Sequence, residues 1–187
     1  MRGIFFITLL FVALGVNAQD KSFSLGLGYV FFGDGDYSGI NYINSFQFPI
    51  FESMDLKIGA QIANAAETDE EYYYHRHNVF NFANNYNLVI TPINFKIFSL
   101  SISTGAIWRY RTEIVFKSSK TVYTESGSPF RMIENEYNKS LDVGYNFDVT
   151  VLFRITEKVN VGLCGQFVGY NKGSGLYAVN LCLNYRL

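Results

Sequence analysis

Strict alternation between apolar and polar or small side chains marks the C-terminal segment of the chain. The odd positions of 177–187 carry Tyr, Val, Leu, Leu, Tyr and Leu, and the even positions carry Ala, Asn, Cys, Asn and Arg. A period of two residues indicates a β-strand with one apolar face. A tilted strand of roughly 9–11 residues is long enough to cross a bilayer. The segment therefore favours a membrane-spanning β-sheet.

The N-terminus carries the pattern of an export signal. Arg2 supplies a positive charge, residues 3–16 are apolar and uncharged, and the small residues that end at Ala18 precede a polar stretch that begins at Gln19. This order is typical of a secretory signal peptide, and the apolar run is too short for a membrane helix. We expect cleavage between Ala18 and Gln19, which makes 1–18 the signal peptide and 19–187 one barrel domain.

The composition fits strands that have one face in contact with lipid. Hydrophobic residues make up 49% of the chain and aromatic residues 18%, whereas charged residues reach only 17%, below the usual value of about 25%. The net charge is −1, and a nucleic-acid partner would need a clustered basic surface. We therefore expect a membrane partner and no nucleic acid.

Similar alternation recurs along the whole chain between clusters of turn residues. The predicted strands span 23–32, 40–50, 54–63, 79–93, 98–111, 141–155, 159–170 and 177–187. The connections after the second, fourth and sixth strands are short, whereas 33–39, 64–78 and 117–138 are longer and polar. An even strand number with short turns on one side and long loops on the other is the organisation of outer-membrane barrels. It predicts periplasmic termini and extracellular long loops. Alternation breaks at 91–98, which predicts a bulge or a displaced turn.

The alternation leaves open which face points outward, because a soluble lipocalin-like barrel buries its apolar face. The apolar face here carries too many large side chains for the narrow interior of an eight-stranded barrel. The polar face is rich in Gly, Ser and Asn, which suit a crowded interior better than a solvated strand face. These two observations favour the lipid-facing arrangement.

In this arrangement, charges of both signs point into the lumen. They are Asp55, Lys57, Arg109, Asp142, Asp148, Arg154 and Arg186. Charges in a low-dielectric interior must pair and form hydrogen bonds. We therefore predict a plugged, salt-bridged lumen. The outward aromatic residues, which we expect in the girdles at the two membrane interfaces, are Tyr29, Trp108, Tyr110, Tyr145, Tyr177 and Tyr185.

At this level the chain resembles the small outer-membrane β-barrel families of the OmpA/OmpX type. The resemblance covers 19–187 and rests on the strand count, the loop asymmetry and the closing strand. It implies an all-β, eight-stranded, antiparallel up-and-down transmembrane barrel, porin-like in architecture, that the barrel-insertion machinery places in the outer membrane. Such barrels commonly end in an aromatic residue, whereas this chain ends Tyr185-Arg186-Leu187. No peptidoglycan-binding domain is expected after the barrel.

The cysteines of the chain, Cys164 and Cys182, share the lumen-facing parity of adjacent predicted strands. Their positions are symmetric about the loop 171–175, so the sequence predicts that they lie directly opposite one another, at a Cα separation of about 4.5–5.5 Å that a disulfide can span. The cell envelope outside the inner membrane is oxidising. Two interpretations stay open: a disulfide, or two small buried thiols that fill a narrow lumen.

No motif indicates catalysis, a metal or a cofactor. His75 and His77 follow an acidic run at 67–71 and could bind a metal together, but two ligands without a fixed third form an ordinary charged loop more often than a site. A lipid-modifying enzyme would need a serine next to a positioned histidine, and both histidines lie in this one segment. We expect no catalytic residue, no bound metal and no cofactor.

The functional prediction is accordingly a monomeric, non-catalytic barrel with an envelope-structural or surface-interaction role. The loops 64–78 and 117–138 are the candidate contact surface for an extracellular ligand or protein, because binding usually resides in long loops on a rigid scaffold. The alternative for these segments is strand extension above the membrane without a ligand. A lipid-modifying outer-membrane enzyme and a soluble ligand-binding barrel remain the alternative functions.

Overall fold

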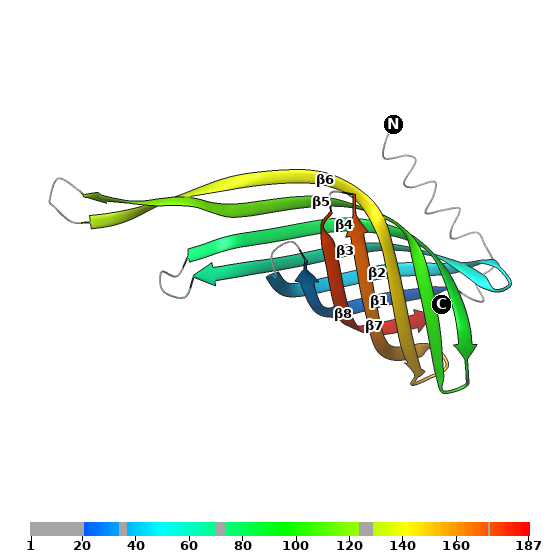
Figure 1. The fold of residues 1–187 in the computed structure, drawn as a ribbon. Coiled ribbons are helices and arrows are strands. Elements are labelled where there is room, and N and C mark those ends of the chain that lie inside the picture. The colour runs from blue at the N-terminus through cyan, green and yellow to red at the C-terminus, as the bar shows by residue number, and fades with distance from the viewer. Residues whose placement is uncertain (1–20, 34–36, 70–73, 124–128, 172) are drawn as a thin grey trace.

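In the computed structural model, the described residues form a closed barrel of eight antiparallel strands (Figure 1). The structure describes residues 21–33, 37–69, 74–123, 129–171 and 173–187. The predicted signal peptide and its cleavage junction between Ala18 and Gln19 lie outside these residues. Within the described part of the chain, no helix is long and apolar enough to cross a membrane.

Each strand pairs with its neighbours in sequence, and β1 pairs with β8 to close the ring. The strands are β1 (Ser22–Phe32), β2 (Tyr37–Phe51), β3 (Met54–Asp69), β4 (Tyr74–Asn94), β5 (Phe98–Tyr123), β6 (Pro129–Arg154), β7 (Val159–Tyr170) and β8 (Gly175–Arg186). This order confirms the predicted eight-stranded up-and-down topology. We call the end with the short β2–β3, β4–β5 and β6–β7 turns the turn end, and the opposite end the loop end.

The apolar face of the sheet points outward. On β8, Leu181 is 62% exposed whereas the next residue, Cys182, is 5% exposed. The same alternation runs along β7, where every second residue from Asn160 to Tyr170 is buried and those nearer the turn end are small or polar. A belt of exposed apolar side chains around a closed barrel is the surface that lipid requires. The soluble lipocalin-like alternative needs the opposite arrangement and is therefore wrong.

Aromatic residues mark the two ends of the apolar belt differently. Tyr29, Tyr145 and Tyr177 are exposed near the loop end. At the turn end, Tyr185 is accompanied by exposed phenylalanines, including Phe153. The hydroxyl-bearing rings that suit a membrane interface are thus concentrated toward the loop end.

Two hairpins extend far beyond the barrel at the loop end. β5 and β6 each contain 26 residues, and β3 and β4 contain 16 and 21, compared with roughly 9–11 for a membrane crossing. Figure 1 shows the β5–β6 hairpin reaching well past the other strands. The prediction of loops at 64–78 and 117–138 is therefore wrong for most of both segments, which are paired strand. A strand above the membrane needs no apolar face, so its sequence lacks the alternation that identifies a strand.

Register shifts interrupt the ladder at the turn end as well as in the hairpins. The shift between Ile90 and Ile93 on β4 confirms the irregularity predicted at 91–98. A second shift lies between Pro49 and Phe51 on β2. Bulges of this kind are common at barrel rims, where they redirect side chains.

Some glycines lie where adjacent strands approach too closely for any side chain. A Cβ atom on Gly105 would lie 2.0 Å from the carbonyl oxygen of Tyr86, and one on Gly28 would lie 2.0 Å from that of Val179. Glycine inside a strand often marks a close backbone approach. These positions allow the strands to close around the narrow lumen.

Candidate functional site

The candidate site is the lumen, where side chains from strands that are not neighbours in the sheet meet. Nζ of Lys57 on β3 lies 2.6 Å from Oδ2 of Asp148 on β6. The same carboxylate oxygen accepts hydrogen bonds from Ser103 Oγ at 2.9 Å and from Asn87 Nδ2 at 3.0 Å. Hydrogen bonds of this number compensate a buried carboxylate for the loss of water. The ion pair joins opposite walls of the barrel.

A layer of amide side chains lies beyond this ion pair, on the loop-end side. Asn41 donates a 2.8 Å hydrogen bond to Asn180, and Gln61 donates to Asn41 at 2.8 Å and to Gln166 at 2.9 Å. All of these residues are buried. The layer therefore connects β2, β3, β7 and β8 across the interior. Asn41, Gln61 and Gln166 fall on the polar face of the alternating pattern, but the pattern alone does not indicate that they bond to one another.

A second buried ion pair lies closer to the loop end. Nε of Arg109 is 3.0 Å from Oδ2 of Asp142, and Ser140 donates a 2.8 Å hydrogen bond to the same oxygen. The guanidinium also donates to Ser174 and lies 3.6 Å above the ring centroid of Tyr170. Arginine stacks on aromatic faces while its fork binds a carboxylate. The side chain is held from several directions at once.

Apolar side chains surround this second ion pair at the loop end. The cluster is built from Val30, Phe32, Ala63, Ala65, Val79, Ala83, Ile107, Val168, Tyr170, Leu176 and Ala178. The interior is therefore polar toward the turn end, whereas toward the loop end apolar side chains are mixed with buried polar residues such as Arg109 and Asp142. The signal was present in the sequence, because Val30 and Phe32 fall on the lumen-facing parity of β1, opposite to the other large residues of that strand.

Four of the seven predicted lumen charges form the two buried ion pairs, Lys57–Asp148 and Arg109–Asp142. The other three, Asp55, Arg154 and Arg186, lie nearer the turn end. Asp55 accepts a 2.6 Å hydrogen bond from Gln47 Nε2. Arg154 is only half-buried, and Arg186 is exposed opposite Ser22 at the end of β8. Arg186 is not a buried lumen charge, because the strand reaches the mouth of the barrel before this residue.

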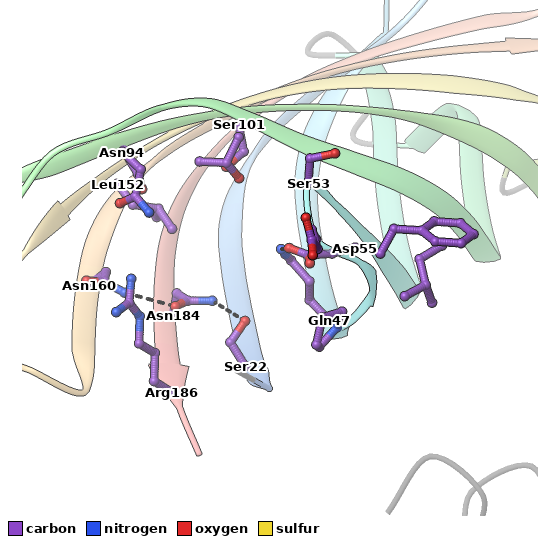
Figure 2. Close-up of a pocket in the computed structure, with 16 residues that line it drawn as sticks. Ser22, Gln47, Ser53, Asp55, Asn94, Ser101, Leu152, Asn160, Asn184 and Arg186 are labelled. Atoms are coloured by element: carbon purple, nitrogen blue, oxygen red, sulfur yellow. Dashed lines mark hydrogen bonds between the residues drawn. The ribbon is translucent and has the colours of Figure 1, made fainter. Parts of the chain in front are cut away.

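A cavity of about 1020 Å³ opens at the turn end (Figure 2). We call it the turn-end cavity. On one wall, Asn160 donates to Asn184 at 3.0 Å, and Asn184 donates to Ser22 at 3.0 Å. On another wall lie Gln47 and Asp55. The predicted lumen charges Asp55 and Arg186 thus belong to a water-accessible recess.

The cysteines are neighbours, but not in the predicted register. Cys182 lies opposite Gly162, and Cys164 lies opposite Asn180. The two cysteines are therefore diagonal rather than directly opposite, since the register is two residues away from the one that the loop symmetry predicted. Both are buried free thiols in the structure. A disulfide between them stays a prediction that would require the strands to adjust.

His77 belongs to a contact group at the loop end that the sequence did not indicate. Its Nε2 lies against Oε1 of Glu113, which also lies 3.2 Å from Nη2 of Arg111. The His77 ring packs edge-on against Tyr37 with 4.1 Å between ring centroids. The side chain of His75 lies outside the described residues. Among the described side chains, no group of three or more His, Cys, Asp or Glu residues could hold a metal ion.

Comparison with known proteins gives a fold but no sequence relative. No protein-family model matches the chain, and no curated protein matches it. Ail, the attachment invasion locus protein of Yersinia pestis, is 11% identical over 91% of this chain and 100% of its own, with a TM-score of 0.53. Neisserial surface protein A is 9% identical over 89% of this chain and 97% of its own, with a TM-score of 0.57.

A third similar structure is from Thermus thermophilus. A major outer membrane protein from Thermus thermophilus is 11% identical over 89% of this chain and 99% of its own, with a TM-score of 0.58. Together with the exposed apolar belt, these similarities confirm the small outer-membrane β-barrel fold of the OmpA/OmpX type. The fold of this chain is therefore that of small, porin-like integral barrels of the outer membrane.

Proposed function

We propose that the protein is a non-catalytic outer-membrane barrel whose lumen is closed to ion flow and whose extended hairpins form a contact surface outside the cell. The proposal rests on the difference between the interior of the barrel, which side chains fill, and the two hairpins, which extend beyond it. Polar networks and an apolar cluster occupy the lumen, while the β3–β4 and β5–β6 hairpins extend beyond it.

Closure of the lumen rests on three successive barriers. The Lys57–Asp148 pair, the amide layer around Gln61 and the Arg109–Asp142 pair each join opposite or neighbouring walls. The apolar cluster then fills the loop end. Eight strands leave an interior only wide enough for side chains. Ions would have to displace buried, mutually bonded groups to pass.

The contact surface rests on what the β5–β6 hairpin exposes. Tyr123, Met132 and Tyr137 are exposed large side chains on it, and Lys117 and Glu134 form an ion pair of 3.1 Å between its strands. Aromatic residues and methionine are enriched in protein interfaces. Two of the proteins with similar structures are an attachment invasion locus protein and a surface protein, which fits a surface role. Periplasmic termini, which place these hairpins outside the cell, are part of the proposal.

The non-catalytic part of the proposal rests on the surroundings of His77. Activation of a serine nucleophile on a lipid needs a histidine that the acyl group can approach. His77 is 9% exposed and is packed against Tyr37 and Glu113, which leaves a lipid acyl group little access to it. A lipid-modifying activity would be detected as a change in the acyl chains of lipid A or phospholipids incubated with the purified barrel, and we expect no change.

Conductance across planar lipid bilayers tests the closed lumen. We expect no stable current steps from the purified, refolded protein. In a variant that combines Arg109→Ala and Tyr170→Ala, which removes the large side chains of the loop-end barrier, we expect brief openings. Steady ohmic conductance by the unmodified protein would contradict the proposal.

Shortening the long hairpin tests the contact surface. Phe116 pairs with Asn135, so a two-residue turn in place of 117–134 keeps the register of the remaining ladder. We expect the shortened barrel to fold and insert normally but to lose adhesion of barrel-bearing cells to protein-coated and cell-coated surfaces. A matched control exchanges Lys96, which is exposed in the β4–β5 turn at the opposite end, for Gln and retains adhesion. Unchanged adhesion after shortening would remove the hairpin from the proposed function.

A further inference from the structure

We propose that the turn-end cavity is a binding site for a saccharide, held through pairs of neighbouring hydroxyl groups. The cavity has a volume of about 1020 Å³, at the upper end of the range of roughly 300–1,000 Å³ typical of ligand pockets. With periplasmic termini, the cavity opens to the periplasm. The proposal concerns this recess alone and is independent of the hairpins at the other end.

The cavity is blind at its inner end. Asp55 and Ser101 line it, and alternate residues of a strand point to the same face. The next lumen-facing residues on these strands are Lys57 and Ser103, whose Nζ and Oγ atoms are 2.9 Å apart in the buried network around Asp148. The network forms the floor, so a molecule that enters from the turn end cannot pass farther into the lumen.

The lining is dominated by neutral groups that both donate and accept hydrogen bonds. Its amide residues are Gln47, Asn94, Asn160 and Asn184, and serine and threonine hydroxyls lie between them. An amide side chain presents a donor and an acceptor side by side. Two adjacent sugar hydroxyls offer the complementary pair. Amide side chains spaced around a recess therefore match the hydrogen-bonding pattern of a saccharide.

Mutual hydrogen bonds hold these groups in place before any ligand enters. Figure 2 shows Asn160, Asn184 and Ser22 in a continuous chain along one wall. On another wall, Gln47 Nε2 donates to Asp55 Oδ2 at 2.6 Å. The Asp55 carboxylate is a charged acceptor, and hydrogen bonds to charged acceptors are stronger than neutral ones. Preorganised groups lose less entropy when a ligand binds.

Both bulges at the turn end supply residues to the cavity. Pro49, Ile50 and Phe51 flank the register shift on β2, and Thr91 lies within the shift on β4. Bulges redirect side chains and occur next to functional sites. Phe51 belongs to the lining and is 69% exposed, so the lining includes an apolar ring. Such a surface suits the C–H face of a sugar ring.

The charges of the lining disfavour other ligand classes. Glu52 and Asp55 repel phosphate and other anions, and Arg186 at the mouth is the cation of the lining. A lipid chain would leave the amide groups of the wall without partners, which is costly. A neutral, polyhydroxylated molecule satisfies these groups without bringing an unpaired charge.

Titration of trisaccharides into the full barrel in lipid nanodiscs tests the proposal. The probes are chitotriose, which carries N-acetyl groups, and maltotriose, which does not, each followed by NMR of backbone amides up to about 10 mM, where millimolar affinities are detectable. We expect at least one probe to shift the amides of Ser22, Gln47 and Asn184 in a saturable manner. The responding probe distinguishes an N-acetylated glycan from a plain glucan as the source.

Paired variants localise the site. Loss of one hydrogen-bonding side chain in Asn184→Ala or Gln47→Ala weakens binding about tenfold, whereas Asn171→Ala, an exposed asparagine at the loop end, leaves it unchanged. Because Asn184 is buried, Gln47→Ala keeps the test valid where Asn184→Ala fails to fold. Ser99→Phe, which fills the mouth, abolishes binding. The absence of saturable shifts with both probes, or shifts confined to the loop end, would overturn the proposal.

Discussion

Lys57 on β3 and Asp148 on β6 meet at 2.6 Å across the interior of the barrel. These strands are separated by β4 and β5 in the sheet, so no backbone hydrogen bond connects them. The ion pair therefore connects two strands that share no backbone hydrogen bonds. Ser103 and Asn87 complete the surroundings of the carboxylate.

Removing one partner of the Lys57–Asp148 ion pair is expected to destabilise the barrel strongly. Lys57→Met leaves the Asp148 carboxylate buried without its cation, at a cost of about 3–5 kcal/mol. The double variant with Asp148→Leu should recover much of the loss, because no charge then remains uncompensated. Urea unfolding in detergent micelles measures both changes. A single variant as stable as the unmodified protein would show that the pair contributes nothing.

The cysteines are expected to be protected free thiols. Their diagonal register does not match the directly opposite placement that cross-strand disulfide geometry favours, and both are buried. A maleimide reagent should label neither in the folded barrel and both after unfolding without reductant. Recovery of no free thiols after such unfolding would instead establish the disulfide.

The Lys117–Glu134 pair is expected to titrate as a coupled surface pair. The hydrogen bond and charge of Lys117 lower the pKa of Glu134 below its ordinary 4.5, and Glu134 raises the pKa of Lys117 above 10.5. The Glu134 contribution is thus present above pH 4.5 and is lost as pH falls through the lowered pKa. The Lys117 contribution is present below pH 10.5 and is lost as pH rises through the raised one.

Carboxyl NMR of Glu134 checks this pair. Lys117→Met should move the pKa of Glu134 back toward its ordinary value, whereas Lys139→Met on β6 should leave it in place. Because the pair is fully exposed, global stability should hardly change. An unchanged pKa of Glu134 in Lys117→Met would contradict the ion pair between these two side chains.

Gly105 is expected to tolerate no side chain. A Cβ there would meet the carbonyl oxygen of Tyr86 and the Cα of Asn87 at 2.0 and 2.7 Å, and backbone atoms cannot move aside cheaply. Gly105→Val should therefore prevent closure or lower the urea midpoint markedly. Gly173→Ala, in a position with no neighbouring atom but a positive φ of 82°, should cost only about 1 kcal/mol. Equal effects of both variants would contradict the close strand approach.

The membrane-spanning strands could be predicted because one face of each must be apolar. Val159–Tyr170 has the predicted bounds, and the faces of β1 and β8 are assigned correctly. The hairpins above the membrane could not be predicted in the same way. Around Ser118 and Glu134, which are register partners, pairing depends on the backbone ladder and requires no alternation in the side chains.

Which residues face the lumen could be predicted more easily than which of them contact one another. Parity placed Lys57, Arg109, Asp142 and Asp148 inside, but which charge meets which depends on the tilt and stagger of the closed barrel. The same stagger shifts the cysteines from opposite to diagonal. The loop-end apolar cluster was visible at Val30 and Phe32, where the polar face of β1 carries large apolar residues.

Cell fractionation followed by gel electrophoresis with and without boiling tests the lipid-facing barrel most directly. The full chain is expressed, and the outer-membrane fraction is compared with the soluble fraction. The account predicts recovery in the outer membrane and a band whose mobility changes on boiling, since a closed barrel resists SDS until it is heated. Recovery as a soluble protein without detergent, with no heat-dependent shift, would contradict the outward apolar face and the proposals built on it.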